Sequence, residues 1–184
     1  MKVNKSLKKV ILGGAFVALT VIGAWISIPI GSIPITLQLF FVLLSGFILG
    51  PKYGFWTQVA YLSLGAIGLP VFANFAGGVT VFFTPVGGYL LAFPIAALCA
   101  GKCITIKNKT INFAWSVLLP ICIIYASGAT VLNIFLKSPK KAIMIGVVPF
   151  IGIDLVKAVI AYIIALKVNN LTKYNNMLKI NKGE

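Results

Sequence analysis

Acidic residues are nearly missing from this sequence, and histidine and arginine are missing altogether. Its 184 residues include two acids, Asp154 and Glu184, and sixteen basic residues, all of them lysines. The absence of histidine excludes histidine-based catalytic triads and HExxH zinc sites. The absence of arginine argues against a nucleic-acid partner despite the net charge of +14, because arginine is the preferred residue for reading bases and binding phosphates.

Charged residues of either sign are also scarce. They make up 10% of the chain, whereas 60% is hydrophobic and the mean hydropathy is +1.05. Soluble domains carry about 25% charged residues, so the composition predicts an integral membrane protein embedded in a lipid bilayer. Because a spanning helix needs roughly 20 residues plus a connection, the chain has room for about five to seven spans and for no soluble domain.

Motifs for nucleotide or metal chemistry are missing as well. The sequence has no G-x-x-x-x-G-K-[ST] loop, since AGKC at 100–103 lacks both the upstream glycine and the hydroxyl. Active transport would therefore need a partner or an ion gradient. Cys99 and Cys103 share one helix face, but small residues that pack between membrane helices explain them better than a metal or redox pair. We expect no cofactor and no metal.

Apolar runs separated by glycine, proline and lysine predict an all-α membrane protein with six transmembrane helices in a single domain over 1–184. The stretch at 142–148 is apolar but precedes Pro149, so it is expected to form a separate short segment. The spans are expected at about 7–28, 36–50, 55–68, 86–101, 113–135 and 149–168.

Residues 69–85 are too apolar for a solvated loop, yet they are punctuated by glycine and proline. Irregular backbone is tolerated at membrane depth where it lines a cavity, which predicts a lid-like segment here. With six spans, twelve lysines fall on the side of the two termini, three on the other side, and Lys157 inside the last span. By the positive-inside rule, both termini are expected in the cytoplasm and the lid-like segment outside.

The stretch IGIDLVKAVIAY, residues 151–162, places Asp154 and Lys157 inside the last apolar run. At positions i and i+3 they share one helix face and are close enough to pair. Each charge costs about 2.5–3.5 kcal/mol at a bilayer centre, so such residues usually face a cavity or each other. A purely structural pair is the alternative, because Asp154 lies near the start of its helix, where the dipole favours a carboxylate.

As a binding site, this pair offers one acceptor and one donor side by side. That combination suits a polar, uncharged head group such as a urea or an amide. A catalytic role is less attractive, because the spans hold no second acid and no histidine to act as the acid–base partner. We therefore predict a ligand site without catalytic residues.

Polar and aromatic residues near the outer face complete the predicted site. Small-molecule pockets are mostly apolar with a few polar contacts, and glycine lets the backbone approach a ligand closely. The predicted substrate-binding residues are Asp154, Lys157, Asn74, Gln38, Tyr89, Thr36, Phe75 and Gly78.

Four stretches resemble, in order along the chain, the BioY family, the biotin-binding S components of energy-coupling factor (ECF) transporters. They run from the first span to the last, whereas 102–148 and 169–184 contribute little. The stretches are ISIPIGSIPITLQLFFVLLSGFILGPKYG (26–54), GAIGLPVFANFAGG (65–78), TPVGGYLLAFP (84–94) and PFIGIDLVKA (149–158).

The resemblance implies a six-helix S-component fold that captures biotin from outside and delivers it across the bacterial plasma membrane. It also implies three partner subunits: a transmembrane ECF coupling subunit and two ABC-type ATPases. Docking onto the coupling subunit is expected through small residues of the first helix, which are Gly14 and Ala18 here.

The resemblance further implies roles for individual residues. Asp154 and Lys157 would hold the ureido end of biotin, and Asn74 would supply the polar side chain of the outer segment. Because the chain has no arginine, Asn74 or backbone N–H groups near Gly77–Gly78 are expected to hold the carboxylate end. Three alternatives stay open: an S component for another vitamin, an intramembrane enzyme, and a structural or pore-forming bundle.

Overall fold

The computed structural model describes the backbone of residues 5–29, 31 and 33–181, and their side chains between residues 6 and 170. Lys2 and Lys182, which were counted toward the side of the termini, lie outside the described residues. In chain order the elements are α1 (Lys5–Trp25), β1 (Ser27–Ile28), β2 (Ile35–Thr36), α2 (Gln38–Leu49), α3 (Pro51–Ala66), the 3-10 helices η1 (Ala73–Phe75) and η2 (Val79–Phe83), α4 (Gly87–Leu91), α5 (Phe93–Cys103), α6 (Lys109–Leu136), α7 (Pro139–Gly146) and α8 (Val148–Asn181).

Helices lie over all six segments predicted as spans, and local sequence signals set several of their ends. Gly50 adopts φ 84°, which turns the chain between α2 and α3, and Pro51 then opens α3 at a position where its missing N–H costs nothing. Asn108 caps α6, since its side-chain oxygen accepts hydrogen bonds from the N–H groups of Thr110 and Ile111. The short segment predicted at 142–148 is α7.

The structure shows two local features that the sequence did not predict. The span expected at 86–101 is broken at Ala92 into α4 and α5, because Pro94 cannot donate an N–H and its ring clashes with the preceding turn. An all-α fold also omitted a small hairpin: α1 stops at Trp25, and Ser27 and Ile28 pair antiparallel with Thr36 and Ile35.

Among the described residues, three helices are long and apolar enough to cross a membrane: Ser6–Trp25, Lys109–Leu136 and Val148–Asn170. The 12 residues of α2 and the 16 of α3 give lengths of about 18 and 24 Å at 1.5 Å per residue, short of a hydrocarbon core of about 30 Å. Large apolar side chains such as Trp115, Ile134 and Ile160 are exposed on the helix surfaces. This distribution is that of a helical membrane protein whose outer surface contacts lipid.

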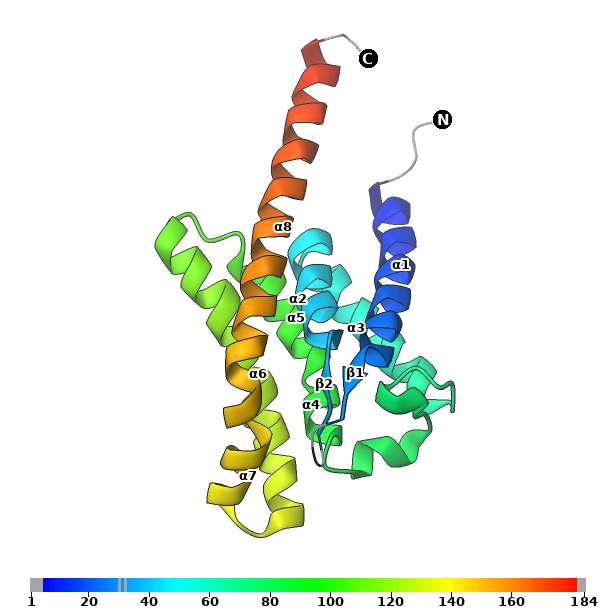
Figure 1. Ribbon diagram of the computed structural model, residues 1–184. Coiled ribbons are helices and arrows are strands. Elements are labelled where there is room, and N and C mark those ends of the chain that lie inside the picture. The colour runs from blue at the N-terminus through cyan, green and yellow to red at the C-terminus, as the bar shows by residue number, and fades with distance from the viewer. Residues whose placement is uncertain (1–4, 30, 32, 182–184) are drawn as a thin grey trace.

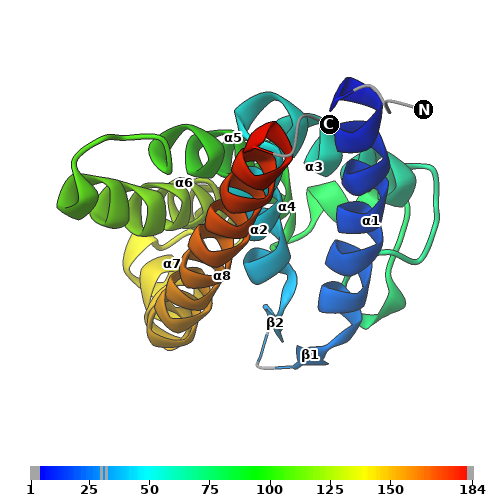
Figure 2. The same ribbon diagram turned by 90° about the horizontal axis from the view of Figure 1, so that it is seen from above.

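The helices form a bundle around α2, which packs against α1, α3, α5 and α8. Both described ends of the chain, the start of α1 and the end of α8, lie at one end of the molecule (Figure 1). The hairpin, the segment 69–85 and α7 lie at the opposite end. Seen along the other direction, α1 and the 69–85 segment lie on one side of α2, and α6, α7 and α8 lie on the other (Figure 2).

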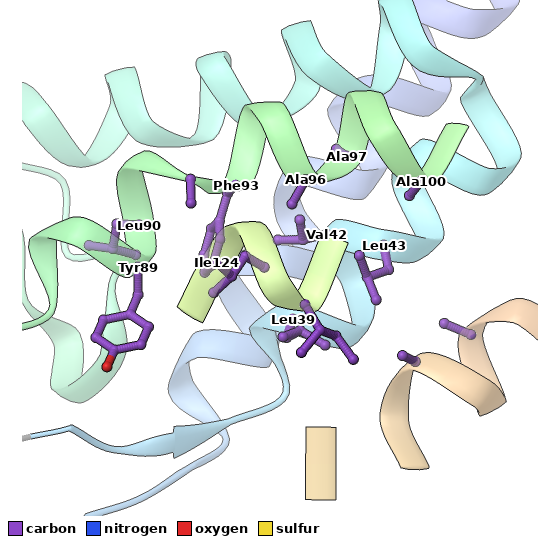
Figure 3. Packing of buried hydrophobic residues seen from close by; sticks show 14 of the residues in the cluster. Leu39, Val42, Leu43, Tyr89, Leu90, Phe93, Ala96, Ala97, Ala100 and Ile124 are labelled. Atoms are coloured by element: carbon purple, nitrogen blue, oxygen red, sulfur yellow. The ribbon is translucent and has the colours of Figure 1, made fainter. Parts of the chain in front are cut away.

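The core between α2, α4, α5 and α6 is filled by aliphatic side chains with a few rings, as Figure 3 shows for Leu39, Val42, Phe93 and Ile124. Toward the end that holds the termini, α2, α3 and α5 approach so closely that only small residues fit. A Cβ on Gly46 would lie 2.1 Å from the carbonyl oxygen of Ala97. We call Gly46, Gly54, Ala97, Ala100 and Gly101 the small-residue core.

Candidate binding site

A cavity of about 310 Å³ opens at the end of the molecule away from the termini. Its walls come from the hairpin, the start of α2, the 69–85 segment, and helices α4 to α8. Of the elements that line it, α6 and α8 lie on one side of α2 in the ribbon views and the 69–85 segment lies on the other (Figures 1 and 2). Its volume is within the range of about 300–1,000 Å³ typical of small-molecule pockets, and most of its lining is apolar.

Asp154 lines this cavity from the second turn of α8 and is 8% exposed. Its Oδ1 lies 2.8 Å from Nζ of Lys157, so the predicted pairing of the two residues is confirmed. The lysine Nζ also donates to the carbonyl oxygen of Thr36, 2.7 Å away, which ties α8 to strand β2. Lys157 itself is not among the cavity-lining residues, but it contacts two of them, Asp154 and Thr36.

Sequence reasoning missed Tyr125. This residue lies on α6, lines the cavity, and donates its hydroxyl proton to Oδ2 of Asp154 at 2.8 Å. Both carboxylate oxygens are therefore engaged, one by an ammonium and one by a phenol. The available signal was a hydroxyl-bearing ring within the run ICIIYASGAT of a predicted span, since buried tyrosine hydroxyls usually need a partner.

Thr36 and Gln38 both line the cavity, as predicted for the site, where the hairpin passes into α2. The hydroxyl of Thr36 donates to Oε1 of Gln38 at 3.2 Å. The amide Nε2 of Gln38 donates to the hydroxyl of Tyr61 at 2.6 Å, and this hydroxyl donates to the carbonyl oxygen of Val71 at 2.9 Å. This relay fixes the side chain of Gln38 and ties the start of the 69–85 segment to α3.

Asn74 and Tyr89 are the other predicted residues that the structure brings to the cavity. Oδ1 of Asn74 accepts a hydrogen bond from the Ser27 hydroxyl at 3.3 Å, so the amide NH₂ is the donor that Asn74 can offer a ligand. The hydroxyl of Tyr89 donates to the carbonyl oxygen of Gly146 at 2.9 Å. The apolar body of Tyr89 therefore forms wall, while its hydroxyl joins α4 to the end of α7.

Phe75 and Gly78 were predicted to contact the ligand, but neither lines the cavity. Phe75 is 63% exposed and packs its ring against Trp25, with centroids 5.2 Å apart. The N–H of Gly78 donates to the carbonyl oxygen of Gly65 at 2.7 Å. That N–H is therefore already used, whereas Asn74 lines the cavity and has its amide NH₂ as a donor.

The two residues expected to dock a partner, Gly14 and Ala18, lie one turn apart on the exposed face of α1. No described atom lies within 4 Å of a Cβ placed on Gly14. Phe16 and Thr20 point the other way and are buried. Within the described part of the chain, no three side chains of the kinds that bind metals come together.

A family model for BioY matches residues 1–174 of this chain. This chain belongs to the BioY family. The resemblance recognised in the sequence is therefore confirmed, and it extends across 102–148, where the sequence motifs were uninformative.

BioY relatives match nearly the whole chain. The biotin transporter BioY of Thermotoga maritima is 48% identical over 168 residues, which cover 90% of this chain and 98% of that protein. A probable biotin transporter BioY of Pyrococcus horikoshii is 46% identical over 165 residues, which cover 90% of this chain and 98% of that protein. A solved structure of the S-component for biotin from an ECF-type ABC transporter matches with a TM-score of 0.83 and 28% identity, over 92% of this chain and 95% of that one.

Proposed function

We propose that this chain captures biotin with high affinity and delivers it across the cell membrane, as the substrate-binding S component of an ECF-type transporter and not as an enzyme. The observation that carries the proposal is the buried carboxylate of Asp154 on the cavity wall, held by Lys157 and Tyr125. A carboxylate kept in so apolar a cavity suits N–H donors of an uncharged ligand, and the BioY relatives are named as biotin transporters.

In this proposal the ureido ring of biotin meets Asp154, and Lys157 pairs with the carboxylate from behind. The apolar bicyclic ring and tail pack on the aromatic wall that includes Phe72, Tyr89 and Phe93. The NH₂ group of Asn74, on the opposite side of the cavity, is our candidate for the carboxylate end of biotin. Thr36 and Gln38 shape the wall between these two ends.

We also propose six membrane-spanning segments, with the termini in the cytoplasm and the cavity open to the outside. The shared end of α1 and α8 supports this topology, because it is the side to which most lysines were assigned. The 69–85 segment lies at the opposite end, over the cavity. The exposed small residues Gly14 and Ala18 would dock the coupling subunit, which two ABC-type ATPases would drive.

The test is a titration of the purified protein in detergent against a panel of biotin, riboflavin and thiamine. We expect saturable binding of biotin near one to one, and no competition from the other two vitamins. Saturable binding of riboflavin or thiamine, together with failure of biotin to bind, would identify an S component for another vitamin. The absence of any saturable ligand would favour a structural or pore-forming bundle and would contradict the proposal.

A further inference from the structure

Three lysines lie on the turn between α6 and α7, at the end of the molecule that holds the cavity (Figure 1). Lys137 is the residue at which α6 ends, and Lys140 and Lys141 lie in the first turn of α7. All three are exposed, and we call them the turn lysines. The hairpin, the 69–85 segment and α4 at the same end carry no charged side chain at all.

Neither the fold nor the topology requires the turn lysines. A helix N-terminus disfavours cations, so Lys140 and Lys141 gain nothing from the dipole of α7. Within the described residues the only acid is Asp154, and it pairs with Lys157, so no described carboxylate is left for the turn lysines. The lysine excess of membrane proteins belongs to the cytoplasmic side, opposite to the side proposed for this turn. The described contacts therefore give these three charges no structural role.

The turn lysines are close enough to act on the cavity. α7 ends at Gly146, which lines the cavity and whose carbonyl oxygen accepts a hydrogen bond from Tyr89. Lys140 and Lys141 come six and five residues before Gly146, so their backbones lie about 8–9 Å from it along the helix. The Debye length is about 8 Å at physiological ionic strength and about 30 Å at 0.01 M. The potential of the turn lysines therefore reaches the cavity, most strongly at low salt.

The cavity itself offers an anion no net positive charge. Among the residues that line it, only Asp154 is charged, and the buried Lys157 beside it brings the charge of the pair to zero. Biotin carries an alkyl carboxylate, which is ionised at neutral pH. The field that this anion meets as it approaches the cavity is therefore set by the turn lysines and not by the site.

We propose that the turn lysines form an electrostatic capture surface for an anionic ligand, the carboxylate form of biotin. They raise the rate at which the anion enters the cavity through the combined potential of three charges, and they make no bond to the bound ligand. This inference rests on the proposed function. It adds the ligand class that this surface favours, which is small carboxylates over their uncharged derivatives. Because steering acts on encounter, the association rate carries the effect and the dissociation rate does not.

The first arm of the test measures kon and koff of biotin with the protein in a neutral detergent, at about 0.01 M and about 1 M salt. We expect kon of wild type to fall about threefold or more at high salt, because the Debye length shrinks from about 30 Å to about 3 Å. The triple variant Lys137→Gln/Lys140→Gln/Lys141→Gln should lose most of this salt dependence by starting from a lower kon at low salt. Its koff should equal that of wild type.

Lys102→Gln/Lys107→Gln/Lys109→Gln is the matched control. It removes the same number of charges from exposed positions at the other end of α6, a helix of 28 residues, which is about 42 Å long at 1.5 Å per residue. This variant should keep the salt dependence of kon. Since all the substituted side chains are exposed, both triple variants should unfold within about 2 °C of wild type.

The second arm changes the charge of the ligand and leaves the protein unchanged. Biotinamide keeps the ureido ring and the tail of biotin but replaces the carboxylate by a neutral amide. Its kon should be the same at both salt concentrations, and the same in wild type and in the turn-lysine variant. This arm separates steering of the anion from a general effect of salt, or of the variant, on the cavity.

Equal kon for biotin in wild type and in the turn-lysine variant at low salt would overturn the inference and leave the proposed function standing. The same loss of kon in the control variant would also overturn it, since the net charge of the chain would then be responsible. So would an unchanged kon with a faster koff, because the lysines would then hold the bound ligand. If wild type bound neither biotin nor biotinamide, the proposed function and this inference would both fail.

Discussion

The two ends of this molecule are built by different rules. Near the termini, α2, α3 and α5 meet through the small-residue core, where regular helices touch backbone to backbone. At the other end the backbone is irregular, with a two-residue hairpin and two short 3-10 helices, and polar side chains hold it. Tyr61, Trp25 and Lys157 each donate to a backbone carbonyl of the hairpin or of the 69–85 segment.

Stability and recognition therefore reside at different ends of the molecule. Tight helix packing leaves no space, so a change there is felt as strain. The cavity end leaves space for a ligand, and side chains there donate hydrogen bonds to backbone carbonyl oxygens. Substitutions in the small-residue core should therefore lower stability, and substitutions on the cavity wall should lower affinity.

Gly46→Val should have the largest effect. A Cβ at this position would lie 2.1 Å from Ala97 O and 2.9 Å from Ala97 C, both backbone atoms that cannot move aside. We expect destabilisation of at least about 3 kcal/mol, at the upper end for overpacking, seen as a fall in Tm of about 6–12 °C. Thermal unfolding in detergent measures this, and the fraction that stays folded should bind biotin with unchanged Kd.

Gly152→Ala is the matched control for Gly46→Val. Gly152 is helical in α8, and no described atom lies within 4 Å of a Cβ placed there. Alanine should keep or raise Tm, because glycine in a helix interior costs up to about 1 kcal/mol relative to alanine. A Gly46→Val protein with normal Tm and weak biotin binding would break the proposed division between the two ends.

The Asp154–Lys157 pair tests the other end. Asp154→Asn leaves the Lys157 ammonium buried beside a neutral group, and breaking a buried pair costs about 3–5 kcal/mol of stability. The double variant Asp154→Asn/Lys157→Met removes both charges, which is often close to neutral for stability. We expect Tm to fall in the single variant and largely to recover in the double variant. Biotin Kd should rise about 100-fold or more in both, as loss of a charged contact of about 3 kcal/mol implies.

Measuring Tm and Kd for the same preparations separates the two effects. If the double variant bound biotin like wild type, Asp154 would be a structural partner of Lys157 and not a ligand contact. The wild-type titration is the reference for both variants.

Features set by neighbours in sequence were predictable here. The pairing of Asp154 with Lys157 follows from their i,i+3 spacing on one helix, and the helix over each apolar run follows from composition. The break at Ala92 has a local signal too, Pro94, although the run stays apolar through it.

Features set by tertiary packing were not predictable. Tyr125 reaches Asp154 across 29 positions of chain, and nothing in the run around it says which way its ring faces. In the 69–85 segment, Asn74 and Phe75 both have positive φ, 57° and 58°. Such backbone follows neither the helical nor the strand period, so the lining residue Asn74 could not be told from its neighbour Phe75.

Phe75 provides the prediction with the smallest expected effect. It is 63% exposed, contacts Trp25 and lies outside the cavity, so Phe75→Ala should change biotin Kd by less than about twofold. Phe72, three residues earlier, is the matched comparison. It is 2% exposed, lines the cavity and packs against Tyr61 and Phe82, so Phe72→Ala should weaken binding at least tenfold and lower Tm as well. Titration of both variants with biotin decides whether the 69–85 segment contacts the ligand through its inward face alone. Equal losses for the two would mean that the outer face, with Trp25, also shapes the site.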